Sequence, residues 1–108
     1  MTVYMTQFSY TAEAFAALAK NPEDRSAPVK ALVESLGGRF IGMWYSFGDY
    51  DGVILTEAPD NGTAATAVIA ATLGGHIKDI KTTVLLTIDE AMSATGRAGN
   101  IVYRAPEG

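Results

Sequence analysis

The sequence predicts one α+β domain with the element order β-α-β-β-α-β, and three observations lead to this expectation. Blocks rich in β-branched and aromatic residues alternate along the chain with blocks rich in alanine and leucine. Glycines or prolines stand between the blocks, where turns are expected. The chain has 108 residues, of which 48% are hydrophobic, a size and composition that suit one core.

The N-terminal part predicts one strand followed by one helix. Residues 2–9 mix valine, tyrosine, threonine and phenylalanine, which suit a pleated and partly buried surface. Thr11 offers a hydroxyl that would cap a helix, and residues 12–20 (AEAFAALAK) are strong helix formers. This helix is expected to stop at Asn21, because the following Pro22 disfavours helical backbone in the residue before it.

The next segment predicts further helix. Residues 27–36 place apolar side chains on one helical stripe, and the glycine pair at residues 37–38 is a C-terminal cap signal. Pro28 fits the first turn of this helix. The sequence leaves open whether Pro22 and Pro28 interrupt one long helix or separate two short ones.

A hairpin and another helix follow. Residues 39–47 (RFIGMWYSF) and residues 53–56 are apolar runs, and the glycines and aspartates of residues 48–52 supply turn chemistry between them. Residues 63–73 (TAATAVIAATL) are rich in alanine and end at a second glycine pair. This pattern predicts a helix that packs closely on a sheet.

The C-terminal part predicts a last strand and a tail. Residues 77–87 are rich in β-branched side chains, residues 89–94 are expected to form at most a short helix, and residues 97–108 form a tail beyond a domain of residues 1–96. The complete order corresponds to a ferredoxin-like fold, a four-stranded antiparallel sheet with helices on one face. The opposite face must then be solvated, covered by the tail or buried against another subunit.

The second predicted strand has large apolar groups on both faces, because side chains alternate along a strand. The residues expected on one face are Ile41, Met43, Tyr45 and Phe47. Those expected on the other face are Phe40, Gly42, Trp44 and Ser46. A monomer would expose a sizeable apolar patch, which usually marks an interface or a ligand groove. We therefore expect a homo-oligomer, most simply a two-fold dimer with its sheets face to face.

The predicted hairpin also carries a sequence signature. Residues 48–51 read Gly-Asp-Tyr-Asp, residues 36–38 read Leu-Gly-Gly and residues 56–59 read Thr-Glu-Ala-Pro. With these motifs the chain resembles the GYD domain family over residues 2–92. The resemblance implies an assembly similar to the dimeric α/β barrel proteins, in which two ferredoxin-like subunits pair their sheets and enclose a pocket. It implies no catalytic residues, because the family has no assigned activity and a fold alone does not define a function.

The leading candidate for a chemical site is the cluster in the predicted turn, formed by Asp49, Tyr50 and Asp51. Two carboxylates beside a phenol would act as general acid and base or bind a cation, because close like charges raise the pKa of one carboxyl. We favour the alternative that the aspartates shape the turn while Tyr50 packs against a helix end. His76, the only histidine, is a weaker acid–base candidate, and a loop-capping role is favoured for it.

Aromatic side chains are the candidate ligand-binding residues. Trp44 and Tyr45 point to opposite faces of the predicted sheet, and Tyr4 from the first strand accompanies one of them. With Tyr50 they would line an apolar pocket, although packing in a core or interface is the favoured interpretation. The sequence does not decide which face carries Trp44 and which carries Tyr45.

Composition argues against several functional classes. Twelve acidic against eight basic residues give a net charge of −4, which would repel nucleic acid. The chain has no cysteine, no signal-peptide pattern and no long apolar run, so we expect a cytoplasmic protein without a membrane partner. Dinucleotide, P-loop, hydrolase and zinc-protease motifs are absent from the sequence, and we expect no cofactor and no metal.

Two functional hypotheses remain. The first is a non-catalytic, homo-oligomeric binding or accessory protein with a pocket between subunits for a small apolar or aromatic molecule. The second is a small cofactor-independent enzyme of the barrel monooxygenase or isomerase kind, with Asp49, Asp51 or His76 as acid or base. We favour the first because it requires no catalytic motif. A pocket with an ionisable group pointing into it would favour the second.

Overall fold

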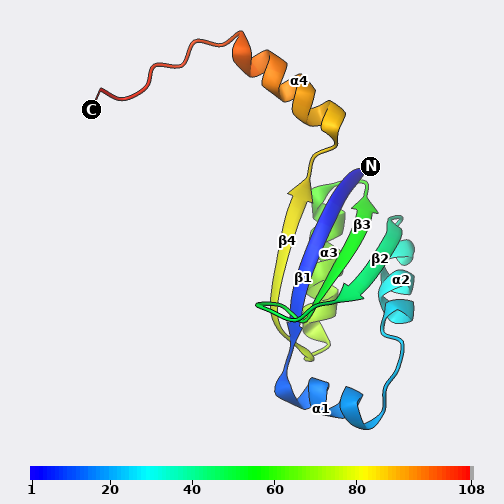
Figure 1. Cartoon of the computed structure of the whole chain (residues 1–108). Helices are drawn as coiled ribbons and strands as arrows, with labels where there is room; N and C mark the ends of the chain where they lie inside the picture. The colour runs from blue at the N-terminus through cyan, green and yellow to red at the C-terminus, as the bar shows by residue number, and fades with distance from the viewer. Residues whose placement is uncertain (108) are drawn as a thin grey trace.

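The computed structural model describes residues 1–107 and contains the expected four-stranded sheet (Figure 1). The strands are β1 (Thr2–Tyr10), β2 (Arg39–Tyr45), β3 (Gly52–Ala58) and β4 (Ile77–Leu85). They form one antiparallel sheet in the order β2-β3-β1-β4. The helices are α1 (Ala12–Lys20), α2 (Ser26–Ser35), α3 (Asn61–Leu73) and α4 (Ile88–Gly99). The α+β class and the ferredoxin-like order of elements are confirmed.

The first two helices begin and end where local signals indicate. The Thr11 hydroxyl accepts a hydrogen bond from the Ala14 backbone N–H at 3.1 Å and caps α1. α2 is a separate helix with Pro28 in its first turn, and Pro22 lies in the break of residues 21–25, so the segment forms two short helices. Gly37, just after α2, has a φ of +80°, which glycine adopts without the strain of a side chain.

The sheet has two unlike faces. We call the side of Tyr4, Thr6 and Phe8 the helix face, because α2 and α3 lie over it and these three residues are buried. The opposite side, turned toward the viewer in Figure 1, is the open face, and no helix of residues 1–107 covers it. The register places on this open face Val3, Met5, Gln7, Gly42, Trp44, Val53, Leu55, Thr83 and Leu85.

The face assignment of β2 requires a correction. The register between β2 and β3 shifts between Phe40 and Gly42, which marks a β-bulge. As a result Phe40 and Tyr45 share the helix face, whereas Trp44 lies on the open face. Strict alternation had placed Phe40 with Trp44, and the extra residue of the bulge, Ile41, reverses that relation.

The C-terminal region differs most from expectation. β4 ends at Leu85 because Thr87 caps α4: its hydroxyl accepts from the Glu90 N–H, and the Glu90 carboxylate accepts from the Thr87 N–H, both at 3.0 Å. α4 continues to Gly99, so the expected domain boundary at residue 96 falls inside a helix. α4 projects beyond the end of the sheet (Figure 1) and has no substantial packing contact with another element of residues 1–107.

Candidate functional site

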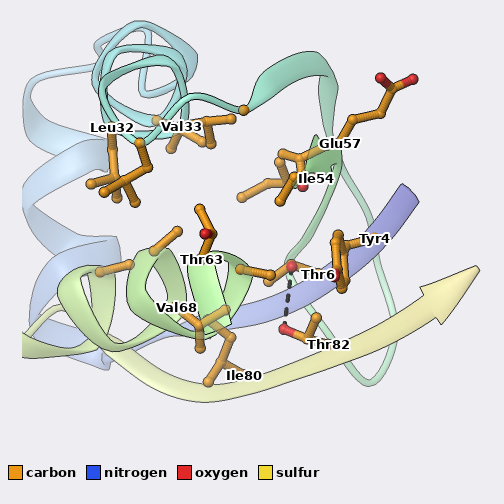
Figure 2. A pocket seen from close by; sticks show the side chains of 18 residues that line it. Tyr4, Thr6, Leu32, Val33, Ile54, Glu57, Thr63, Val68, Ile80 and Thr82 are labelled. Carbon is orange, nitrogen blue, oxygen red and sulfur yellow. Dashed lines mark hydrogen bonds between the residues drawn. The ribbon is translucent and has the colours of Figure 1, made fainter. Parts of the chain in front are cut away.

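An apolar cavity lies between α2, α3 and the helix face of the sheet (Figure 2). Its cavity volume is about 80 Å³, and the figure rises to about 660 Å³ only when the space open to solvent is included. We call it the α2–α3 pocket. Its helical walls are Val29, Leu32, Val33 and Leu36 from α2 and Thr63, Ala64, Ala67, Val68 and Ala71 from α3. The sheet contributes Tyr4, Thr6, Ile54, Thr56, Ala58, Ile80 and Thr82.

The pocket exists because the two helices stand apart over the sheet. α2 and α3 have no substantial contact with each other in the described part of the chain, so their inward side chains line a space instead of packing together. Ala64, Ala67 and Ala71 share one side of α3 by their helical spacing. Alanine is the smallest side chain on that wall, and it leaves the gap unfilled.

Two threonines form the polar part of the pocket floor. The hydroxyl oxygens of Thr6 and Thr82 are 3.3 Å apart and share a hydrogen bond, drawn as the dashed line in Figure 2. One hydroxyl donates in that bond, so the other O–H and the remaining lone pairs are left for a bound molecule. The nearby Tyr4 hydroxyl is engaged elsewhere, because it donates to Asn61 Oδ1 at 2.6 Å.

Glu57 is the carboxylate among the lining residues, and it is held by an ion pair. Arg39 Nη2 donates to Glu57 Oε1 at 2.8 Å, and Arg39 Nε donates to Oε2 at 3.3 Å. These hydrogen bonds keep the pKa of Glu57 below its usual value. Figure 2 shows the Glu57 carboxylate pointing away from the cavity. The pocket therefore has no free carboxylate with which to transfer a proton.

The predicted cluster of Asp49, Tyr50 and Asp51 lies in the loop of residues 46–51 that joins β2 to β3. The Asp51 carboxylate accepts a hydrogen bond from the Tyr10 backbone N–H at 2.9 Å and ties this loop to the end of β1. Asp49 is exposed and Tyr50 is half-buried. For Asp51 the observed contact is of the kind that shapes a loop.

Tyr10, which sequence reasoning did not single out, brings several of the candidates together. Its hydroxyl lies 3.2 Å from the Tyr45 hydroxyl, and its ring centroid lies 6.2 Å from that of His76. Burial and the hydrogen bond to Tyr45 raise the pKa of Tyr10 above its ordinary value. The His76 carbonyl accepts from the Thr11 N–H at 3.0 Å, which joins the start of β4 to the start of α1. The alternation of side chains along β1 could have identified Tyr10, because Tyr10 continues the buried side of this strand.

The aromatic candidates do not share one site within the chain. Tyr4 lines the α2–α3 pocket, whereas Trp44 lies on the open face and is 52% exposed. Tyr45 lies at the edge of the helix face and is 57% exposed. Tyr50 belongs to the loop. Their expected roles in ligand binding stay predictions.

Residues 1–107 contain neither a metal-binding cluster nor a membrane-spanning helix. In that range no three histidine, aspartate or glutamate side chains converge as a metal site requires. None of the helices there has the length and apolar character needed to cross a membrane.

Solved structures with low sequence identity share the fold. TTHA0845 from Thermus thermophilus has 17% identity and a TM-score of 0.50, and the match covers 81% of this chain and 95% of that one. A transcriptional regulator from Neisseria meningitidis, solved as an L-Met complex, has 15% identity and a TM-score of 0.51, covering 81% of this chain and 51% of that one. A NIPSNAP-like domain protein from Burkholderia xenovorans has 17% identity and a TM-score of 0.50, and the match covers 81% of this chain and 84% of that one. Such identities establish a common fold and leave function open.

The family of the chain follows from its own sequence. A search of curated proteins finds no match. The GYD domain model matches residues 4–95, which take in β1 from Tyr4 onward, the other three strands and most of α4. This range agrees with the resemblance carried by the hairpin motifs. The chain belongs to the GYD domain family.

Proposed function

We propose that this chain is a homo-oligomeric binding protein that holds a small apolar or aromatic molecule in the α2–α3 pocket. One observation carries the proposal: a cavity with apolar helical walls and a pair of threonine hydroxyls on its floor. Small-molecule sites are commonly concave and mostly apolar, with a few polar groups that orient the ligand. The matching ligand is an aromatic or branched aliphatic molecule with a single hydroxyl or carbonyl group.

Binding explains this pocket better than catalysis does. A general acid or base must lie within hydrogen-bond reach of the reacting atoms. Glu57 is paired with Arg39 and points outward, and the threonine hydroxyls are weak acids and bases. Asp49, Asp51 and His76, the acid–base candidates of the enzyme hypothesis, are not among the pocket-lining residues. The fold also occurs in the Neisseria regulator solved with L-Met, which supports small-molecule binding as a use of this architecture.

The oligomer in this proposal rests on the open face. Apolar side chains such as Val3, Met5 and Leu55 lie there, and a second subunit would remove them from water. The pocket expected between subunits stays a separate prediction, since the α2–α3 pocket lies within one chain. We assign the function to the cytoplasm, because a chain without cysteine gains nothing from an oxidising compartment.

A pocket-filling variant with a matched control tests the binding site. Ala67 lines the pocket, whereas Ala70, on the same helix, is exposed and does not. Phenol, a small aromatic molecule with one hydroxyl group, serves as the probe, and isothermal titration calorimetry measures its binding. We expect saturable binding to the unmodified chain, and Ala67→Leu should weaken it about tenfold or more, because the added isopropyl group occupies the probe's space. Ala70→Leu should leave the affinity unchanged.

Each outcome is decisive when circular dichroism shows that both variants keep their helices. Binding that both substitutions weaken equally, or that neither weakens, would place the probe elsewhere and refute the site. An unmodified chain without saturable binding would refute the proposed function itself.

A further inference from the structure

The C-terminal arm, residues 88–103, carries an apolar stripe that nothing in residues 1–107 covers. On α4 the spacing places Ile88, Ala91 and Met92 on one side, and Asp89 and Ser93 away from it. Ile88 is 77% exposed and Met92 is 66% exposed. The exposed apolar residues that continue the arm are Ile101, Val102 and Tyr103.

A helix of this kind is not stable by itself. Isolated helices shorter than about 12–15 residues are marginal in water, and α4 has 12 residues. Gly96 and Gly99 within it weaken it further, because glycine has a much lower helix propensity than alanine. The capping box at Thr87 and Glu90 offsets only part of that cost. A formed α4 therefore implies a surface on which its apolar side packs.

The extended shape of the chain leaves more accessible surface than a compact monomer has. Its accessible surface is 7621 Å², whereas a compact monomer of 11.4 kDa has about 5,800 Å². Its radius of gyration is 17.7 Å, against about 13 Å for a compact domain of this length. The excess surface, about 1,800 Å² per chain, exceeds the roughly 800 Å² per partner that a stable interface buries.

We propose that the C-terminal arm packs its apolar stripe against a second copy of this chain, reciprocally in a two-fold dimer. The chain carries two uncovered apolar surfaces, the arm and the open face, and Figure 1 shows the arm directed away from the sheet. Only Leu86 and Thr87 join the arm to β4, an edge strand, so the arm begins at the border of the open face. A two-fold dimer would bury both surfaces, because the arm of each copy would meet the open face of the other. This inference shares the homo-oligomer with the proposed function and is independent of the ligand.

Charge substitutions on the two sides of α4 test the arm in the full-length chain. Met92→Asp places a carboxylate in the apolar stripe. Ser93→Asp places the same group at the next residue, which lies on the polar side of α4. We expect Met92→Asp to raise the dimer dissociation constant at least about tenfold in sedimentation equilibrium, because a buried unpaired carboxylate is costly. Ser93→Asp should leave it within about twofold. Equal dissociation constants for the two variants would overturn the inference.

Cross-linking identifies the surface that the arm meets. The chain has no cysteine, so single-cysteine variants report one contact each. A mixture of Met92→Cys and Leu55→Cys chains should form a disulfide-linked heterodimer on mild oxidation, and a mixture of Ser93→Cys and Leu55→Cys should form far less. Equal yields would refute docking of the stripe on the open face of a second copy. Phenol binding to Met92→Asp should stay unchanged, so failure of the arm and failure of the pocket are distinguishable.

Discussion

Replacing Gly52 with alanine should destabilise the domain through one identifiable clash. A Cβ at this position would lie 2.3 Å from Cζ and 2.6 Å from Cε1 of Phe8, well inside the 3.4 Å at which ordinary contact begins. The Phe8 ring is 2% exposed and packs edge-on against Tyr10, with ring centroids 5.2 Å apart. The ring therefore has little room to move, and overpacking of this kind costs about 1–3 kcal/mol.

Gly48 supplies the matched control, because a Cβ there meets nothing within 4 Å. Both substitutions reduce the freedom of the unfolded chain equally, which stabilises by about 0.4–1 kcal/mol. We expect the urea midpoint of Gly52→Ala to fall by about 1 M relative to Gly48→Ala, for a difference of about 2 kcal/mol. Combining Gly52→Ala with Phe8→Leu should shrink its penalty, because the ring atoms are gone. Equal midpoints for the two alanine variants would refute the clash.

Three further outcomes follow from local contacts. The raised pKa of Tyr10 means that the folded chain holds the hydroxyl proton more tightly than the unfolded chain does. The protonated hydroxyl therefore contributes fully to the free energy of unfolding below pH 10, and this contribution is lost progressively as the pH rises above 10. Tyr10→Phe should therefore flatten the decline of Tm above pH 10, and an unchanged decline would contradict this. Gly42→Ala places a Cβ 2.6 Å from Cη2 of Trp44, and it should shift the emission of this single tryptophan to the red at a stability cost below about 1 kcal/mol. Thr87→Ala removes a capping hydroxyl worth about 1 kcal/mol and should lower the helical circular dichroism, and an unchanged spectrum would contradict this.

Elements with strong signals at both ends were predictable from the sequence. α1 spans the expected residues 12–20, because Thr11 caps its start and Asn21-Pro22 ends it. The hairpin of β2 and β3 and the break before α2 follow from glycine and proline in the same way. These signals act over a few residues, so a reading of local chemistry captures them.

The faces of strands and the ends of helices were harder to predict from the sequence where a single residue changes the result. The bulge beside Phe40 depends on how β2 pairs with β3, and no alternation pattern contains that information. α4 continues to Gly99, beyond the expected residues 89–94, although Gly96 and Gly99 have a low helix propensity. The T-x-x-E pattern of Thr87 and Glu90 was present in the sequence and indicates a helix start, but the β-branched run before it favoured a longer strand.

The candidate site lay beyond sequence reasoning for a different reason. The α2–α3 pocket depends on the distance between two helices, which no segment specifies by itself. Alanines on α3 predicted close packing on the sheet, but Ala64, Ala67 and Ala71 also border an unfilled space beside α2. The residues of the pocket floor, Thr6 and Thr82, stand on strands from opposite ends of the chain, and only the register brings them within 3.3 Å.

The central place of β1 affects how the protein is made. β1 leaves the ribosome before the other three strands of the sheet, yet both of its neighbours, β3 and β4, come from later in the chain. Pairing between strands that are distant in sequence slows folding, because the chain loses the entropy of loop closure before the stabilising contacts form. The β2–β3 hairpin can form while β1 still presents two unpaired edges with Tyr4 and Phe8 on its apolar side. Until Leu85 has been synthesised, one edge of β1 therefore stays without its partner and is open to pairing with the strands of other chains.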